Sequence, residues 1–202
     1  MAAVSEIIVR EFFELNGFFV RQQRKYIAIA RRDDDEIDFL IWNSRYNGDA
    51  GTLPFVLSTL DLTGISRAVV VVKGWHTETF SPGVLANAPE IFRFVDAPVF
   101  HQAARVFRED GPLVKILVVP ALPQNESARA ASIDLLRAKG VDAVIPFRTM
   151  LTDLIGQTEV NRNYQKSDLL QIIRILKNYD FFPEPQLELF KPKRRRKKSR
   201  AQ

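Results

Sequence analysis

A run of four valines followed by a lysine constrains the fold of this chain more than any other feature. Residues 67–73 read RAVVVVK, and the polar stretch GWHTE follows directly. Successive residues of a strand point to opposite faces of a sheet, so consecutive valines predict a strand that is buried on both faces. The lysine at its end requires either a partner or a water-filled cleft, because an unpaired buried ammonium costs several kcal/mol.

Predicted strands and helices alternate after this strand. Residues 115–123 and 141–147 are predicted strands, whereas residues 127–140, 148–157 and 166–182 are predicted helices. Such alternation is typical of a mainly parallel sheet that is covered by helices. We therefore expect an α/β or mixed α+β protein with a central mixed sheet flanked by helices.

The residues before the valine strand add a helix and two strands. Residues 4–15 place apolar side chains on one stripe and predict an amphipathic helix that stops at Asn16-Gly17. Residues 18–32 predict one strand with a possible bend. Residues 36–43 predict a second strand, in which Asp38 stands among apolar residues.

Charge is distributed unevenly along the chain. Eight of the 29 Lys and Arg residues lie in the last twelve positions and all 24 Asp and Glu residues precede them, which leaves 21 basic against 24 acidic residues in the remainder. Repulsion between the clustered charges predicts a disordered tail at 183–202 after a single domain at 4–182.

Two interpretations of this tail stay open. It either keeps the protein soluble or makes salt-sensitive contact with nucleic acid or another polyanion. In a eukaryote the same run would also serve as a nuclear address. The residues that would bind nucleic acid are Lys193, Arg194, Arg195, Arg196, Lys197 and Lys198.

Composition and missing motifs exclude several classes of protein. The chain has no cysteine and two histidines, which rules out disulfides, thiolate metal sites and multi-histidine metal sites. It has no apolar run long enough to span a bilayer and no secretory leader, so we expect a cytoplasmic protein with no membrane partner. The loops GxxxxGK[ST] and GxGxxG are absent, so no nucleotide cofactor is predicted. A homo-oligomer is left open.

The order of these elements resembles that of the PD-(D/E)XK, or restriction-endonuclease-like, nucleases. The resemblance covers most of residues 4–182: a helix with glutamates, a strand, a strand containing Asp38, and a strand ending in Lys73, followed by alternating helices and strands. It implies a nucleic-acid-binding protein that is either a Mg²⁺-dependent phosphodiester hydrolase or a catalytically inactive module for binding or assembly.

The resemblance also implies roles for individual residues. Asp38 would bind Mg²⁺, Lys73 would orient the attacking water, and Glu11 or Glu14 of the first helix would assist. Two carboxylates on adjacent strands would suit an oxygen-ligated ion that activates water. The family places its second carboxylate two residues before the lysine.

That position is occupied by Val71, which is a departure from the family pattern. Glu78 or Glu90 would then have to act as a migrated metal ligand, or the chemistry has been lost. A purely structural interpretation also stays open, in which Asp38 is satisfied by Arg31 or by backbone amides, or pairs with Lys73. Trp75 and His76 are interpreted as packing or surface residues.

Overall fold

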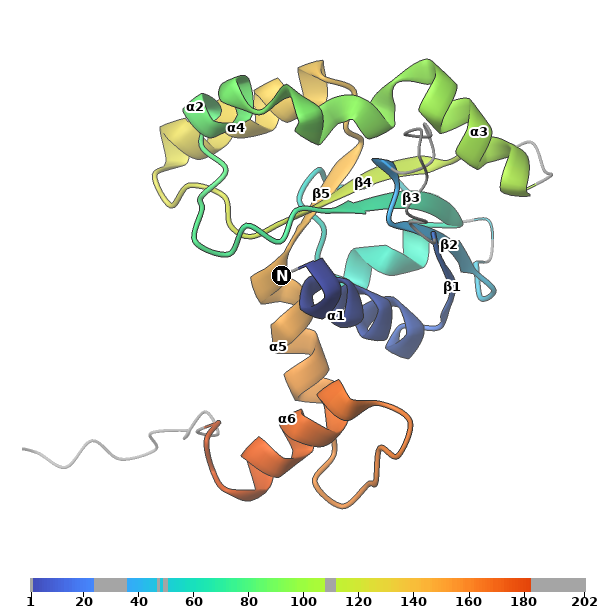
Figure 1. The fold of residues 1–202 in the computed structure, drawn as a ribbon, viewed down its shortest axis with the longest axis vertical. Helices are drawn as coiled ribbons and strands as arrows, with labels where there is room; N and C mark the ends of the chain where they lie inside the picture. Colours follow the sequence, from blue (N-terminus) through green and yellow to red (C-terminus); the bar gives the residue numbers. More distant parts are fainter. Residues whose placement is uncertain (1, 24–35, 47, 49–50, 108–111, 183–202) are drawn as a thin grey trace, which may run out of the picture.

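The computed structural model describes residues 2–23, 36–46, 48, 51–107 and 112–182. Its described residues form a mixed α/β fold in which helices flank a five-stranded sheet with strand order β1-β2-β3-β4-β5 (Figure 1). The first three strands are antiparallel neighbours, whereas β4 and β5 continue the sheet parallel to β3. The predicted class and the mixed sheet flanked by helices are therefore confirmed. The strands are β1 (Phe18–Gln22), β2 (Phe39–Asn43), β3 (Arg67–Val72), β4 (Val114–Val119) and β5 (Ala143–Pro146).

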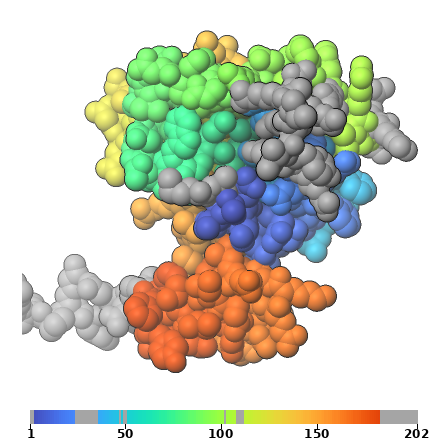
Figure 2. Space-filling model, viewed as in Figure 1, coloured from blue at the N-terminus to red at the C-terminus, as the bar shows by residue number. Residues whose placement is uncertain are grey.

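Helices cover both faces of this sheet. Four segments lie on one face, namely α2 (Pro82–Asn87), the 3-10 helix η3 (Pro89–Val95), α3 (Ala97–Phe107) and α4 (Glu126–Ala138). The other face is covered by α1 (Ala2–Leu15), the 3-10 helix η2 (Thr59–Gly64), α5 (Phe147–Gln157) and α6 (Asp168–Asn178). The space-filling view shows the α2 and α3 segments at the top, α1 below them and α6 at the bottom (Figure 2).

The valine strand is the centre of both cores. Residues 68–71 are at most 1% exposed. Val69 and Val71 pack in the core beneath α2, η3 and α4, whereas Val70 packs with α1 and α5 on the opposite face. This alternation follows from strand geometry and explains why residues 68–72 are all apolar.

Local sequence signals define several helix ends. The side chains of Ser81, Asn125 and Ser167 accept hydrogen bonds from backbone N–H groups in the first turns of α2, α4 and α6. Gly140 follows α4 with φ of 88°, a conformation that a residue with a Cβ rarely adopts. The helical stretch after Ser81 is divided, because Pro89 starts a separate 3-10 helix.

Some predictions fall on residues that the structure does not describe. β1 covers the first five residues of the strand predicted at 18–32, and residues 24–35 lie outside the described ranges, including Arg31. The basic tail predicted at 183–202 lies outside them as well. In the described part of the chain, no helix is both long and apolar enough to cross a membrane.

Candidate functional site

Asp38 and Lys73 lie at the same end of two paired strands. Asp38 directly precedes β2 and Lys73 directly follows β3, and these strands are antiparallel. The Asp38 backbone N–H donates to the Val70 carbonyl at 3.1 Å, and the Lys73 N–H donates to the Val118 carbonyl of β4 at 3.1 Å. Both residues are therefore held by the sheet, at the edge where β3 ends.

The Asp38 side chain is also fixed by the backbone of β3. Its Oδ2 atom accepts a hydrogen bond from the Val72 N–H at 2.7 Å, and Asp38 is 6% exposed. A carboxylate that accepts an N–H in a buried setting forms a strong, charge-assisted hydrogen bond. Asp38 and Lys73 each have a further interaction, so neither is an unpaired charge. The expectation that backbone amides satisfy the Asp38 carboxylate is therefore met for one of its two oxygens, Oδ2.

The first two turns of α1 lie at this same end of the sheet. The Gln22 side chain donates to Glu6 Oε2 at 2.7 Å, and the backbone N–H of the next residue, Gln23, donates to the Asp38 carbonyl at 2.9 Å. Ser5 Oγ lies 2.9 Å from His76 Nε2, just beyond Lys73. Figure 1 shows the amino-terminal end of α1, marked N, beside the start of α5. Glu6 is therefore linked to Asp38 through hydrogen bonds of two consecutive residues, Gln22 and Gln23. It is not among the site residues predicted from the sequence.

Glu11 and Glu14 lie further along α1. They are five and eight residues beyond Glu6, which corresponds to about 7 and 12 Å along a helix axis. They border a different pocket of about 620 Å³, together with residues 163–167 and Leu170. Glu11 is 6% exposed and its Oε1 lies 3.5 Å from Arg10 Nη2. The structure brings these two glutamates together with each other, and not with Asp38.

The environment of Glu14 raises the pKa of its carboxyl group above the usual 4.5. Partial burial is the main cause, because it disfavours the charged form. The neighbouring Glu11 carboxylate raises the pKa as well, whereas the Arg10 guanidinium lowers it. Structural ion-pair networks also produce such shifts, so the raised pKa does not by itself mark Glu14 as a functional residue.

The two residues predicted as migrated metal ligands lie on other segments of the chain than Asp38. Glu78 is exposed in the loop after β3, where its backbone N–H donates to the Trp75 carbonyl at 2.8 Å, and Glu90 is exposed in η3. Val71, at the position of the family's second carboxylate, is 1% exposed in an apolar core. Residues 2–23, 36–46, 48, 51–107 and 112–182 contain no group of three or more His, Cys, Asp and Glu residues that could hold a metal ion. The described donors do not form a Mg²⁺ centre of the family type, and magnesium stays a prediction.

His76 and Trp75 contact aromatic rings. The His76 ring lies 4.6 Å from that of Phe147, edge to face, and the Trp75 ring lies 5.6 Å from that of Phe80. His76 therefore connects the start of α1, through Ser5, with the start of α5. Its two contacts are those of a packing residue.

The six basic residues of the predicted nucleic-acid contact, 193–198, lie outside the described residues. Comparison of the chain with models of known protein families, with curated proteins and with solved structures gives no match. The resemblance to the PD-(D/E)XK nucleases therefore remains a prediction from residue pattern and element order.

Proposed function

We propose that this chain binds nucleic acid through a domain with a restriction-endonuclease-like arrangement, and that its basic C-terminal residues add electrostatic affinity. The observation that carries the proposal is the hydrogen bond from the Val72 N–H to Asp38. It holds a carboxylate at the end of β3, directly before Lys73. The element order supports it, with α1 followed by three antiparallel strands and then two parallel ones.

Binding without catalysis is the form of this function that the site supports best. Val71 replaces the carboxylate that a second metal ligand would supply, and its burial in an apolar core would make an unpaired charged side chain there energetically costly. Lys73 remains suited to a phosphate oxygen, since a lysine ammonium acts as a compact point charge with three donors. Hydrolysis with Mg²⁺ is the second candidate, and the position of Glu6 beside Gln22 favours it.

The binding test uses the full chain and labelled single-stranded DNA, duplex DNA and RNA over a range of salt concentrations. Replacing the basic residues 193–198 with glutamine should weaken binding and flatten its salt dependence, by about 0.7–0.9 in the logarithmic slope for each phosphate that is no longer neutralised. Lys73→Met should weaken binding further, whereas Lys166→Met, at an exposed position, serves as the matched control. A chain that binds none of these nucleic acids would refute the proposal.

The hydrolysis test uses the same substrates and a branched DNA with Mg²⁺ or Mn²⁺. Without catalysis, no metal-dependent cleavage is expected. Cleavage that is abolished in Asp38→Asn and Glu6→Gln, but retained in Glu90→Gln, would establish the second candidate. Cleavage that survives Asp38→Asn and Lys73→Met would instead indicate a contaminating nuclease.

A further inference from the structure

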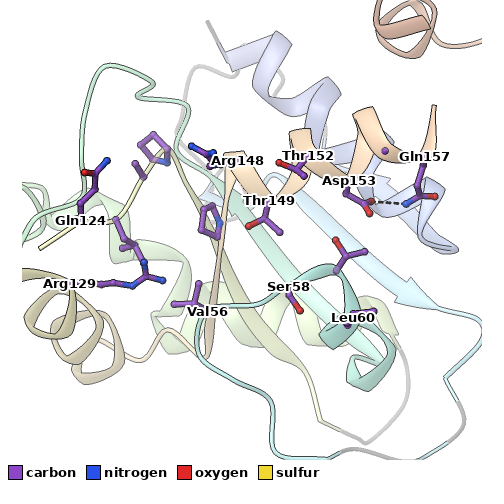
Figure 3. A pocket seen from close by; sticks show the side chains of 16 residues that line it. Val56, Ser58, Leu60, Gln124, Arg129, Arg148, Thr149, Thr152, Asp153 and Gln157 are labelled. Atoms are coloured by element: carbon purple, nitrogen blue, oxygen red, sulfur yellow. Dashed lines mark hydrogen bonds between the residues drawn. The ribbon is translucent and has the colours of Figure 1, made fainter. Parts of the chain in front are cut away.

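A large hollow lies beyond the carboxyl ends of β4 and β5 (Figure 3). Its volume is about 890 Å³. It is bordered by Val56 and residues 58–60, by the loop that follows β4, by Arg129 of α4, and by one side of α5 from its first turn to its last. In open α/β sheets, ligands bind in the crevice outside the carboxyl ends of parallel strands. Among the residues that the structure describes, none of the candidate site residues predicted from the sequence borders this hollow.

Two arginines give the hollow an excess of positive charge. Arg129 comes from α4 and Arg148 from the start of α5, and Figure 3 shows both at its border. Within the part of the chain that the structure describes, neither guanidinium forms an ion pair. The hollow also contains Asp153, whose Oδ2 accepts hydrogen bonds from the side-chain amides of Asn16 at 2.9 Å and Gln157 at 2.7 Å. The carboxylate is thus satisfied by neutral donors, and the arginines remain available to an anion.

Hydroxyl groups stand beside one of these arginines. Thr149 and Thr152 lie one and four residues after Arg148, a spacing that places all three toward one side of α5. Figure 3 shows both threonine side chains along the hollow. Guanidinium and hydroxyl groups together supply the donors that phosphate oxygens accept, and arginine does so in a bidentate manner.

The opposite wall of the hollow carries apolar side chains beside the hydroxyl groups of Ser58 and Thr59. Leu60 of η2 is 85% exposed, and Val56 lies in the same wall. A leucine this exposed at the rim of a polar hollow suits a ligand that carries an apolar or planar group next to its anion. A phosphate ester of a nucleoside has both parts.

The hollow continues the edge of the sheet at which Asp38 and Lys73 lie. The loop after β3 reaches it, because the Phe80 N–H donates to the carbonyl of Ala121 at 2.9 Å, and Ala121 borders the hollow. The His76 ring contacts Phe147, which directly precedes Arg148. A strand of nucleic acid with one phosphate at Lys73 would therefore meet Arg148 along the same edge.

We propose that this hollow binds the phosphate of a nucleotide unit through Arg129 and Arg148, with the base or sugar against Leu60. The nucleotide is either free or part of a nucleic-acid strand, and the second case rests on the proposed function. Since the chain lacks the glycine-rich phosphate loops, the arginine side chains supply the donors that a backbone loop would otherwise provide.

The test is a titration of the isotope-labelled full chain followed by NMR, with inorganic phosphate, adenosine monophosphate and a short single-stranded DNA as separate probes. We expect the backbone amides of Thr149, Thr152 and Gly156 to shift with the monophosphate and with the DNA. Arg129→Gln and Arg148→Gln should each lower the apparent affinity obtained from these shifts about tenfold or more, as expected when a charge-assisted hydrogen bond is removed. Arg162→Gln is the matched control, since Arg162 is exposed and lies 3.9 Å from its partner Glu159.

The apolar wall has its own test. Leu60→Ser should weaken the binding of the monophosphate more than the binding of inorganic phosphate. Equal binding of both probes by the unaltered chain would overturn the assignment to a nucleotide. Unchanged thermal unfolding in all variants is the expected control, because the substituted side chains are exposed. Amides that shift with none of the three probes would overturn the site. So would amides that shift as much in the Arg129 and Arg148 variants as in the unaltered chain.

These outcomes also separate the two proposals. DNA that binds the full chain without moving the amides of α5, in a chain whose α5 amides the monophosphate and inorganic phosphate also leave unmoved, would refute the hollow and leave the proposed function standing. A monophosphate that moves them, in a chain that binds no nucleic acid, would support the hollow as a site for free nucleotides and refute the proposed function.

Discussion

Replacement of Asp38 separates its structural role from any role in binding. In the native chain its Oδ2 accepts the Val72 N–H at 2.7 Å, and the carboxylate is 6% exposed. Asp38→Ala removes this acceptor and leaves a backbone donor near the core without its partner. Loss of a hydrogen bond to a charged acceptor costs about 1.5–3 kcal/mol. We expect Asp38→Ala to lower the free energy of unfolding by about 2–3 kcal/mol.

Asp38→Asn is the matched variant for this prediction. The asparagine has nearly the same shape, and its amide oxygen still accepts from Val72 as a neutral partner. Neutral hydrogen bonds contribute about 0.5–1.5 kcal/mol, so the loss should be roughly 1 kcal/mol or a little more. Both variants are uncharged, so they differ in whether an acceptor for the Val72 N–H is present and not in charge.

Urea unfolding followed by circular dichroism measures both losses, and an unchanged slope against urea shows that the denatured state has not changed. A loss below about 0.5 kcal/mol for Asp38→Ala would refute the reasoning, because it would mean that the Val72 N–H finds another acceptor at little cost. Equal losses for the alanine and asparagine variants would show that charge, and not the hydrogen bond to Val72, determines the contribution of Asp38.

Three further predictions concern individual contacts in the rest of the fold. Gly74→Ala should destabilise the fold by about 1–3 kcal/mol, because the added Cβ would collide with Ser5, and Ser5→Gly in the same chain should recover part of the loss in a double-mutant cycle of urea unfolding. Glu14→Gln should stabilise the protein at neutral pH, since burial raises the pKa of Glu14 and penalises its charged form; the gain should fade as the pH drops toward 4.5, where the wild-type carboxyl is itself protonated. A pH series of melting temperatures checks this, and a gain that grows on acidification would contradict it. Lys177→Met should cost about 2–3 kcal/mol, because its ammonium donates to two carbonyls at the end of α5, each at 2.7 Å, and thereby attaches α6; an unchanged urea midpoint would refute that attachment.

The fold was predictable where the hydrophobic pattern leaves one solution. The valine run requires burial on both faces, and both cores meet at Val70 and Val71. Helix starts at Ser81 and Ser167 follow from side chains that accept backbone hydrogen bonds. The strand order could not be deduced from local pattern, since it depends on contacts between β4 and β3 that lie far apart in sequence.

The sequence could have indicated which glutamate of α1 lies at the Asp38 end of the sheet, although the resemblance pointed to Glu11 and Glu14. Only Asn16-Gly17 connects α1 to β1, so the helix must run antiparallel to that strand. Its amino-terminal turns therefore lie where β1 ends, beside the start of β2 at Asp38. The short connection therefore puts Glu6 closer than Glu14 to this end of the sheet. The amphipathic pattern of α1 alone does not distinguish the two glutamates.

The two faces of the sheet limit what the group at its edge can do. Strand alternation assigns Val71 and Lys73 to the face covered by α2 and α4, whereas Glu6 comes from α1 on the other face. A carboxylate from α1 can approach Asp38 only around the end of β3, where the ladder of hydrogen bonds stops. A ring of ligands around one small ion requires donors that converge from one side. Charges spread along an edge, from Lys73 to Arg148, suit an extended polyanion better than a single enclosed metal ion.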